Sequence, residues 1–339
     1  MTDIDISEIK TLLAKQKRIV IVAHKNPDGD AVGSSLGLYH YLKLKGHEVS
    51  VILPNDYPQF LKWIPGEKHI IKYESNSNLS KDLIDKAELI FTLDFNALHR
   101  TGDMEPCLAK ASAIKILIDH HQQPESYPKY VYSDVNMCAT SQMIYHFIDM
   151  MGDVDVINSN IATALYTGIM TDTGGSFRFK TTTSTTHRVI ANLIDKGANG
   201  EDIHSNVYDT NSYNRLQLLG KSLNNLKVVP ELNTAYISLS QEELNKFNFK
   251  KGDTEGVVNY ALSLKGVKFA AIFIEYNQEG IIKISFRSKG HFNTNALART
   301  HFNGGGHVNA SGGRSTLGLK DTIAKFISIL PDYKQDLNS

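Results

Sequence analysis

The sequence has few cysteines and no long apolar run. Of its 339 residues only two are cysteine, Cys107 and Cys138, and they lie in unrelated contexts, which fits a reducing cytoplasm better than a disulfide scaffold. No apolar stretch approaches the roughly 18 residues that predict a membrane-spanning helix. Residues 1–18 are acidic and amphipathic, unlike a signal peptide. We therefore expect a cytoplasmic protein that does not bind a membrane.

Charge of one sign is not in excess either. Lysine plus arginine number 36, as do aspartate plus glutamate, so the formal net charge is zero. This balance does not predict a large basic surface for long nucleic acid, and a nucleic-acid substrate would have to be short. Hydrophobic residues (41%) and charged residues (21%) occur in proportions typical of folded globular proteins.

The length favours two domains, and the first half has the pattern of an α/β domain. Apolar β-branched runs predict strands at 18–24, 48–54, 88–94 and 114–120. Helical periodicity predicts helices at 30–45, 140–151, 157–170 and 184–196. Because continuous apolar strands joined by helices are typical of buried parallel sheets, we expect a mostly parallel sheet flanked by helices.

The pattern changes in the second half. A polar stretch is followed by a predicted connecting helix at 212–226, and strands are predicted at 234–240, 268–277 and 280–288. A helix at 293–301, a glycine-rich loop at 304–313 and a terminal helix at 318–330 complete a smaller α/β domain. We assign residues 1–190 to the first domain, 191–225 to a connecting segment and 226–339 to the second domain.

Acidic and imidazole residues end three of the predicted strands. His24 ends the first strand, Asp94 ends the third, and Asp119, His120 and His121 end the fourth. In open parallel sheets, ligands bind outside the carboxyl ends of the strands, which meet at one edge. We therefore expect these side chains to converge there.

Three more carboxylates are candidates for the same edge. In the segment HKNPDGD (24–30), proline and glycine bend the loop, so that Asp28 and Asp30 can point inward with His24. Asp30 could instead only cap the helix that follows, a role that aspartate favours. Asp172, in GIMTDTGG, is weak evidence by itself, because a lone aspartate at the end of an element is usually a cap or turn residue.

Together these positions supply two imidazoles and four carboxylates. They are His24, Asp28, Asp30, Asp94, His120 and Asp172. Nitrogen and oxygen ligands without thiolates suit Mn²⁺ or a similar divalent ion and argue against a structural zinc site. Two ions that share one carboxylate can activate water for attack on a phosphoryl group. The set predicts two divalent metal ions, with Mn²⁺ preferred, and hydrolysis of a phosphate ester.

These motifs resemble those of the DHH phosphoesterases, which include RecJ nucleases, family II inorganic pyrophosphatases and nanoRNases. The segment 24–30, Asp94, the triplet Asp119–His121 and Asp172 match the four motifs of the family in order. The resemblance implies two ion sites that share one carboxylate, held by His24, Asp28 and Asp94 and by Asp30, Asp94, His120 and Asp172. It also implies two catalytic residues. Asp119 would orient a histidine, and His121 would contact the scissile phosphate.

The glycine-rich segment resembles a motif of the DHHA1 domain, which accompanies the DHH domain in nanoRNases and binds substrate. Gly304, Gly305, Gly306 and His307 match this motif, and Arg287 ends a preceding strand. We expect these residues to bind substrate, with glycine N–H groups around a phosphate or a base edge. A glycine-rich segment by itself is more often a flexible turn. The S-R-K-K signature of family II pyrophosphatases is absent, which favours a nucleotide over pyrophosphate.

The leading hypothesis is a Mn²⁺-dependent nanoRNase for oligomers of about two to five nucleotides, with phosphatase activity on 3′-phosphoadenosine 5′-phosphate (pAp). Close alternatives are a phosphodiesterase for cyclic dinucleotides such as c-di-AMP, or for pApA, and an exopolyphosphatase. A non-enzymatic alternative is a nucleotide-binding regulator, against which the intact ligand set argues, because unused buried carboxylates are costly. The expected partners are short RNA or a small nucleotide, with a homodimer as the candidate assembly.

Overall fold

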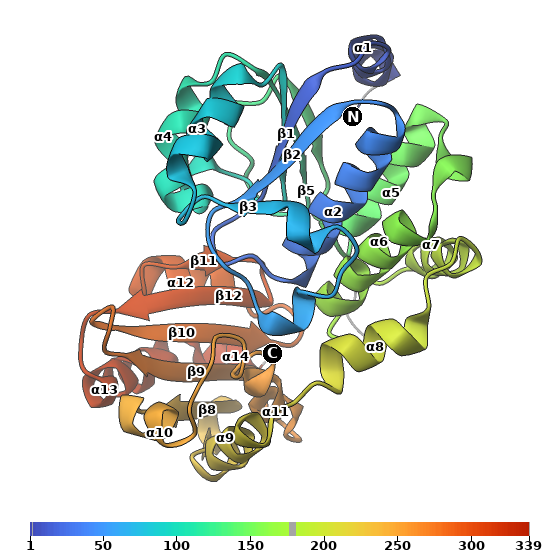
Figure 1. Ribbon diagram of the computed structural model, residues 1–339. Helices are drawn as coiled ribbons and strands as arrows, with labels where there is room; N and C mark the ends of the chain where they lie inside the picture. The colour runs from blue at the N-terminus through green and yellow to red at the C-terminus, as the bar shows by residue number, and fades with distance from the viewer. Residues whose placement is uncertain (2, 176–180, 339) are drawn as a thin grey trace. The chain divides into compact units, whose positions relative to one another are not determined.

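The computed structural model describes residues 1, 3–175 and 181–338. It divides into two compact units, Met1–Thr210 and Asn211–Ser339. Each unit contains one six-stranded sheet with helices, so the expected α/β class with a parallel first sheet and a smaller second domain is confirmed (Figure 1). The domain limits at residues 190 and 225 stay a prediction. Among the described helices, none combines the length and the apolar character that crossing a bilayer requires.

The sheet of the first unit is entirely parallel and has the strand order β3-β2-β1-β4-β5-β6. Its strands are β1 (Arg18–Val22), β2 (Glu48–Leu53), β3 (Ile70–Lys72), β4 (Leu89–Leu93), β5 (Ile114–Asp119) and β6 (Tyr130–Ser133). The four predicted strands are present as β1, β2, β4 and β5. The sequence did not predict β3 and β6, because both are short edge strands whose residues are mostly half-buried or exposed.

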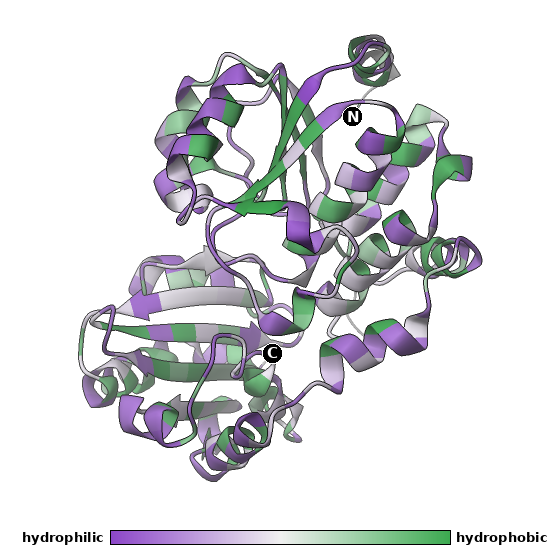
Figure 2. Cartoon of the chain, in the orientation of Figure 1, coloured by the Kyte–Doolittle hydropathy of each residue, from purple (hydrophilic) through white to green (hydrophobic). Residues whose placement is uncertain are grey.

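Helices cover both faces of this sheet (Figure 1). The helices of this unit are α1 (Asp3–Leu13), α2 (Gly29–Leu44), α3 (Ser77–Lys86), α4 (Glu105–Lys110), α5 (Thr140–Met151), α6 (Ser159–Asp172), α7 (Ser184–Asp195) and α8 (Gly200–Tyr208). Along β1, Ile19 and Ile21 pack into the core beneath α2, α5 and α6, whereas Val20 and Val22 pack beneath α3 and α4. Burial on both faces explains why the inner strands are mostly apolar. In Figure 2 these strands are mainly green (hydrophobic), whereas the helices are a mixture of green and purple (hydrophilic).

Glycines let α2 and α6 approach closely. A Cβ atom on Gly33 of α2 would lie 2.6 Å from the carbonyl oxygen of Ala164 in α6. A Cβ atom on Gly168 of α6 would collide with the Ser141 side chain of α5. No larger residue fits at these two contacts, because the N-terminal parts of α2 and α5 pack directly against α6.

The second unit has a mixed sheet with the order β11-β12-β10-β9-β8-β7, in which only β8 and β9 are parallel neighbours among the described strands. The strands are β7 (Lys227–Val229), β8 (Thr234–Leu239), β9 (Phe269–Tyr276), β10 (Ile281–Ser288), β11 (Gly305–Gly306) and β12 (Ala310–Ser315). The helices are α9 (Tyr213–Asn224), α10 (Gln241–Lys246), α11 (Val257–Ser263), α12 (Thr294–His301), α13 (Leu319–Ile329) and α14 (Lys334–Asn338). Phenylalanines fill the core under α12 and α13, and aliphatic residues fill the core under α9, α10 and α11.

Two segments differ from the expectation. The glycine-rich segment 304–313 is not mainly a loop, because β11 and the start of β12 pair there as a hairpin beside β10. Glycine gives a strand no apolar side chain, so the alternation that predicts strands is missing. The polar stretch after residue 196 contains α8, whose only buried apolar side chains are Ile203 and Val207. Two apolar positions were too few to predict this helix.

Candidate metal centre

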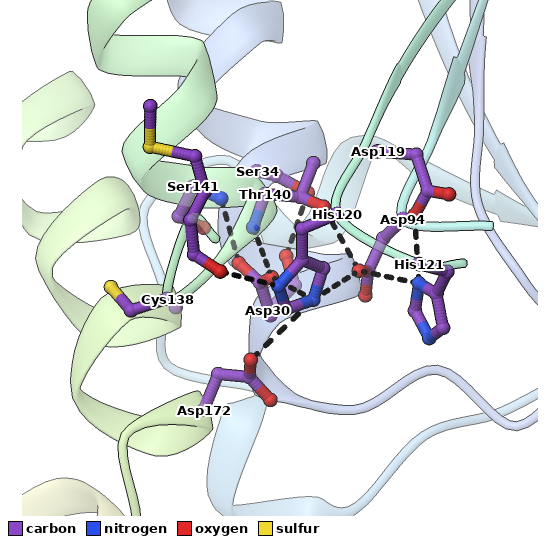
Figure 3. A network of polar contacts seen from close by, with 12 residues as sticks. Asp30, Ser34, Asp94, Asp119, His120, His121, Cys138, Thr140, Ser141 and Asp172 are labelled. Carbon is purple, nitrogen blue, oxygen red and sulfur yellow. Dashed lines mark hydrogen bonds and ion pairs between the residues drawn. The ribbon is translucent and has the colours of Figure 1, made fainter. Parts of the chain in front are cut away.

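Eight predicted site side chains lie in three clusters at the carboxyl edge of the parallel sheet, two of which share Asp94. Figure 3 shows six of the eight, all except His24 and Asp28. In each cluster the potential ligand atoms lie within 4.8 Å of one another. The clusters are His24, Asp28 and Asp94; Asp30, His120 and Asp172; and Asp94, Asp119 and His121. They come from the ends of β1, β4 and β5, from the first turn of α2 and from the last residue of α6. The convergence follows from the shared direction of the strands.

His24 follows β1 and faces two carboxylates. Its Nδ1 lies 2.9 Å from the carbonyl oxygen of Lys25. Because a carbonyl only accepts, Nδ1 carries a proton, and in the neutral ring the lone pair is on Nε2. Nε2 lies 3.4 Å from Asp94 Oδ2 and 3.8 Å from Asp28 Oδ2. The backbone therefore orients His24 with its ligand nitrogen toward both oxygens.

His120 has the same arrangement on the other side of Asp94. Its Nδ1 lies 3.1 Å from the carbonyl oxygen of Met137, which again places the lone pair of the neutral ring on Nε2. Nε2 lies 3.4 Å from Asp94 Oδ1, 3.5 Å from Asp172 Oδ2 and 3.9 Å from Asp30 Oδ2. One imidazole and three carboxylates thus face one another.

The geometry fits two cations that share Asp94. Its Oδ2 faces His24, and its Oδ1 faces His120. Two ligands that each bind an ion at about 2.1 Å are separated by roughly 3.0 Å at a right angle and 3.5 Å at a tetrahedral angle, close to the separations observed. Asp94 also has a left-handed backbone with φ of 63°, which is uncommon for a residue other than glycine and is concentrated at functional sites.

Asp28 and Asp30 have different local roles. Asp28 is the N-cap of α2, and its Oδ1 accepts hydrogen bonds from the N–H groups of Asp30 and Ala31, each at 3.1 Å. The alternative in which Asp30 only caps this helix is therefore wrong. Asp30 lies inside the first turn, with 1% of its surface exposed, and its carboxylate points away from the helix toward α5.

Burial, hydrogen bonds and neighbouring charges shift the pKa values of these groups. Burial by itself lowers the pKa of His24, but the hydrogen bond to Asp94 and the charges of Asp28 and Asp94 outweigh it and raise the pKa to about 9. Burial and neighbouring carboxylates raise the pKa of Asp30 well above its usual range. Burial also opposes ionisation of Asp94, but hydrogen bonds to His120 and His24 lower its pKa well below the usual range. Concentrated buried negative charge of this kind is what divalent cations neutralise.

Asp119 and His121 form a hydrogen-bonded pair within the third cluster. The Nδ1 of His121 lies 2.7 Å from Asp119 Oδ1, and both side chains are buried. Asp119 Oδ2 is also buried and has no hydrogen-bond partner among the described residues. The contact fixes the orientation of the His121 ring. The catalytic roles of both residues stay a prediction.

The sequence did not predict the residues that hydrogen-bond to the candidate metal-binding side chains and hold them in place. Thr140 and Ser141, at the start of α5, donate hydrogen bonds to Asp30, and Thr140 also donates to Asp94. A threonine followed by a serine at a helix start is an ordinary capping pattern, so it carried no signal of this contact. The carbonyl groups of Lys25 and Met137 belong to the backbone and have no sequence signature.

In the second unit, the predicted substrate residues lie on neighbouring strands. Arg287 in β10 pairs with Ala310 in β12, and the N–H group of His307 donates to the carbonyl of Ala310 at 2.7 Å. Asn295 was not predicted; its Oδ1 accepts hydrogen bonds from the N–H group of Gly306 at 3.0 Å and from Arg299 Nε at 3.2 Å. The hairpin therefore brings Arg287 and His307 to one end of the sheet.

Two of the glycines in this hairpin cannot carry a side chain. A Cβ atom on Gly304 would collide with the carbonyl oxygen of Gly312. Gly306 has a φ of 146°, and a Cβ atom there would lie 2.6 Å from the carbonyl oxygen of Ala310. The turn that presents His307 therefore depends on glycine at both positions.

Known proteins match the whole chain. Residues 18–169 match the DHH family, N-terminal domain, and residues 232–333 match the DHHA1 domain. The bifunctional oligoribonuclease and PAP phosphatase NrnA of Thermus thermophilus is 31% identical over 329 residues, which cover 97% of this chain and 93% of the relative. The chain belongs to the DHH family. It is thus a hydrolase of the phosphoesterase class, and the resemblance stated from its motifs is confirmed.

Further proteins with similar sequences or structures are consistent with this family membership. The NrnA enzyme of Bacillus subtilis is 27% identical, with 90% of this chain and 92% of the relative covered. The crystal structure of an exopolyphosphatase-related protein from Bacteroides fragilis is 42% identical, has a TM-score of 0.95 and covers 100% of this chain and 98% of that one. RecJ of Thermus thermophilus with Mn²⁺, at 13% identity and a TM-score of 0.55, covers 98% of this chain and 55% of that one and shares the fold.

Proposed function

We propose that this DHH-family phosphoesterase hydrolyses short oligoribonucleotides and pAp with two Mn²⁺ ions. The observation that carries the proposal is Asp94, whose two oxygens face different imidazoles 3.4 Å away. The relatives named NrnA support oligoribonucleotides and pAp as the substrate class, and the match to the Thermus thermophilus enzyme covers more than nine-tenths of its length.

Each residue of the centre has a proposed role. The ligands of the first ion are His24, Asp28 and Asp94, and those of the second are Asp30, Asp94, His120 and Asp172. When bound, the two ions would supply an activated water and positive charge for the phosphoryl group. His121, oriented by Asp119 through the 2.7 Å contact, donates a hydrogen bond to an oxygen of the scissile phosphate.

A substrate panel with Mn²⁺ tests the proposed function. It contains pAp, pApA, RNAs of five and 40 residues, c-di-AMP, pyrophosphate and polyphosphate. We expect pAp and the five-residue RNA to be hydrolysed fastest, with the short RNA degraded to mononucleotides from one end, because the chain has no net positive charge to hold a long strand. Faster cleavage of the 40-residue RNA would contradict the proposal, and binding of nucleotide without product release would indicate a regulator.

The same panel covers a second candidate function. The relative from Bacteroides fragilis, at 42% identity, is described as exopolyphosphatase-related, which favours exopolyphosphatase as the alternative. Release of phosphate from polyphosphate at a higher kcat/KM than from pAp would establish this alternative. The cyclic-di-AMP phosphodiesterase PdeA of Listeria monocytogenes is more distant, at 23% identity, and this chain spans 49% of its length.

Arg287 and His307 are expected to act in nucleotide recognition and not in metal binding. Arg287→Ala and His307→Ala should each lower kcat/KM for pAp and short RNA by about ten- to a hundredfold, because each removes one charge-assisted contact with the substrate. Hydrolysis of bis-p-nitrophenyl phosphate, which needs no nucleotide pocket, should change much less. Metal content and thermal stability should stay nearly unchanged.

Arg314→Ala is the matched control, since Arg314 is exposed on β12 at the pair with Lys283, four residues beyond Ala310, the partner of Arg287. We expect wild-type kinetics from it. Equal losses on both substrates in the Arg287 and His307 variants, with stability retained, would show that these residues act at the chemical step and would refute the recognition role.

A further inference from the structure

The first turn of α5 contacts two carboxylates of the metal centre. The hydroxyl of Thr140 donates to Asp94 Oδ1 at 3.0 Å. The N–H groups of Thr140 and Ser141 donate to Asp30 Oδ2 at 2.6 Å and to Asp30 Oδ1 at 2.8 Å. Thr140 is fully buried, and Figure 3 shows it between the two aspartates. Thr140 therefore contacts both Asp94, whose oxygens face His24 and His120, and Asp30, which belongs to the cluster of His120 and Asp172.

The contact from the hydroxyl constrains a torsion that is otherwise soft. Rotation of a carboxylate about its Cβ–Cγ bond is only weakly confined by intrinsic preference. In Asp94 this rotation decides whether Oδ1 faces His120 and Oδ2 faces His24, each at 3.4 Å. The carboxylate can only accept, so Thr140 Oγ1 is the donor, and its hydrogen bond fixes Oδ1 on the His120 side.

The backbone contacts hold Asp30 independently of that hydroxyl. The first N–H groups of a helix have no partner within the helix, and the N-cap of α5, Ala139, has no side-chain oxygen to offer them. Asp30 accepts from two of these groups, and its negative charge is favourable at this end of the helix dipole. A side-chain substitution at Thr140 can thus remove the Asp94 contact while it leaves the Asp30 contacts in place.

The first turn of α5 is closely packed against α6. A Cβ atom on Gly168 of α6 would collide with Ser141 Oγ and would lie 2.9 Å from Asp30 Oδ1. The turn is therefore in close contact with the helix that ends at Asp172. Any shift of the first turn of α5 relative to α6 would disturb this close contact.

We propose that Thr140 is a positioning residue, whose hydroxyl holds the Asp94 carboxylate in the orientation that serves two ions at once. This inference rests on the proposed two-ion function. Residues that orient metal ligands typically change metal affinity or activity by about 10- to 100-fold when they are replaced. The effect of Thr140 falls on metal binding and kcat, because its side chain has no proposed contact with the nucleotide.

Titration of the full-length protein with Mn²⁺ by calorimetry tests this inference. Thr140→Val keeps the shape of the side chain and the backbone N–H group but removes the hydroxyl, and Thr140→Ser keeps the hydroxyl. Thr167→Val is the matched control, because Thr167 is fully buried in α6 and its hydroxyl donates only to the carbonyl of Thr163 among the described contacts. We expect Thr140→Val to lose about 10- to 100-fold in Mn²⁺ affinity. Thr140→Ser and Thr167→Val should stay within a few-fold of wild type.

Kinetics and unfolding temperature complete the test. We expect Thr140→Val to lower kcat at saturating pAp with little change in KM, and Thr140→Ser to restore kcat. Thr140→Ala replaces Thr140→Val if the valine variant does not fold, since alanine places no methyl group against Asp94. Unchanged Mn²⁺ affinity in either folded variant overturns the inference. Failure of the wild-type protein to bind two ions would instead overturn the proposed function.

Discussion

Asp94→Ala is expected to lower the rate of pAp and short-RNA hydrolysis by at least about 10³-fold, because in the proposed two-ion centre one carboxylate positions both ions. In the structure its two oxygens face His24 and His120, and no other described carboxylate faces both imidazoles. Loss of Asp94 therefore removes a ligand from each site at once. The measurement is kcat at saturating Mn²⁺ and substrate.

Two further variants separate this loss from a folding defect. Asp94→Asn retains the shape of the side chain, and asparagine tolerates the left-handed backbone at this position, but the negative charge is lost. We expect it to fold and to be nearly as inactive as Asp94→Ala. Asp134→Ala is the control, because Asp134 directly follows β6 and its Oδ1 accepts from the N–H group of Asn136, outside the clusters. Near-normal turnover by Asp94→Asn would show that Asp94 is only a strand-end residue.

Removal of divalent ions is expected to abolish activity, and Mn²⁺ is expected to restore it best. The clusters consist of imidazole and carboxylate groups without a thiolate, a set suited to Mn²⁺. Without cations, protons take their place, because the pKa values of His24, His120 and Asp30 are all raised. Neither a protonated imidazole nor a carboxylate bonded to it can activate water as a cation does.

The experiment compares chelated protein with protein to which Mn²⁺, Mg²⁺, Ca²⁺ or Zn²⁺ has been returned. The rate of pAp hydrolysis should be at background in the chelated sample and highest with Mn²⁺. A sample that retains full activity in excess chelator would rule out the two-ion mechanism. Higher activity with Zn²⁺ than with Mn²⁺ would contradict the expected metal and leave the mechanism in place.

The parallel sheet and the convergence of the site could be predicted from the sequence because both depend on simple periodicities. Continuous apolar runs marked β1, β4 and β5, and the direction that these strands share brings His24, Asp94 and Asp119 to one edge. Asp172 was weak evidence by itself and was assigned through the resemblance to the DHH motifs. The glycine contacts between α2 and α6, which place it beside Asp30, are not visible in a hydrophobic pattern.

The parts that could not be predicted depend on single contacts between distant segments. Asp28 and Asp30 are both aspartates of the same loop, only two positions apart, so the sequence does not decide which of them caps α2. The contacts of Thr140 with Asp30 and Asp94 join residues that are 110 and 46 positions apart. The hairpin of β11 and β12 is held by backbone pairing and by Asn295, and its glycines have no side chains to alternate.

The most direct test of the two-ion centre is a crystal structure of the protein with Mn²⁺, with anomalous scattering measured at the manganese absorption edge. Two peaks are expected at the carboxyl edge of the parallel sheet. One should lie among His24, Asp28 and Asp94, and the other among Asp30, His120 and Asp172, with one Asp94 oxygen bound to each ion. A single peak, or two peaks that do not share Asp94, would contradict the account.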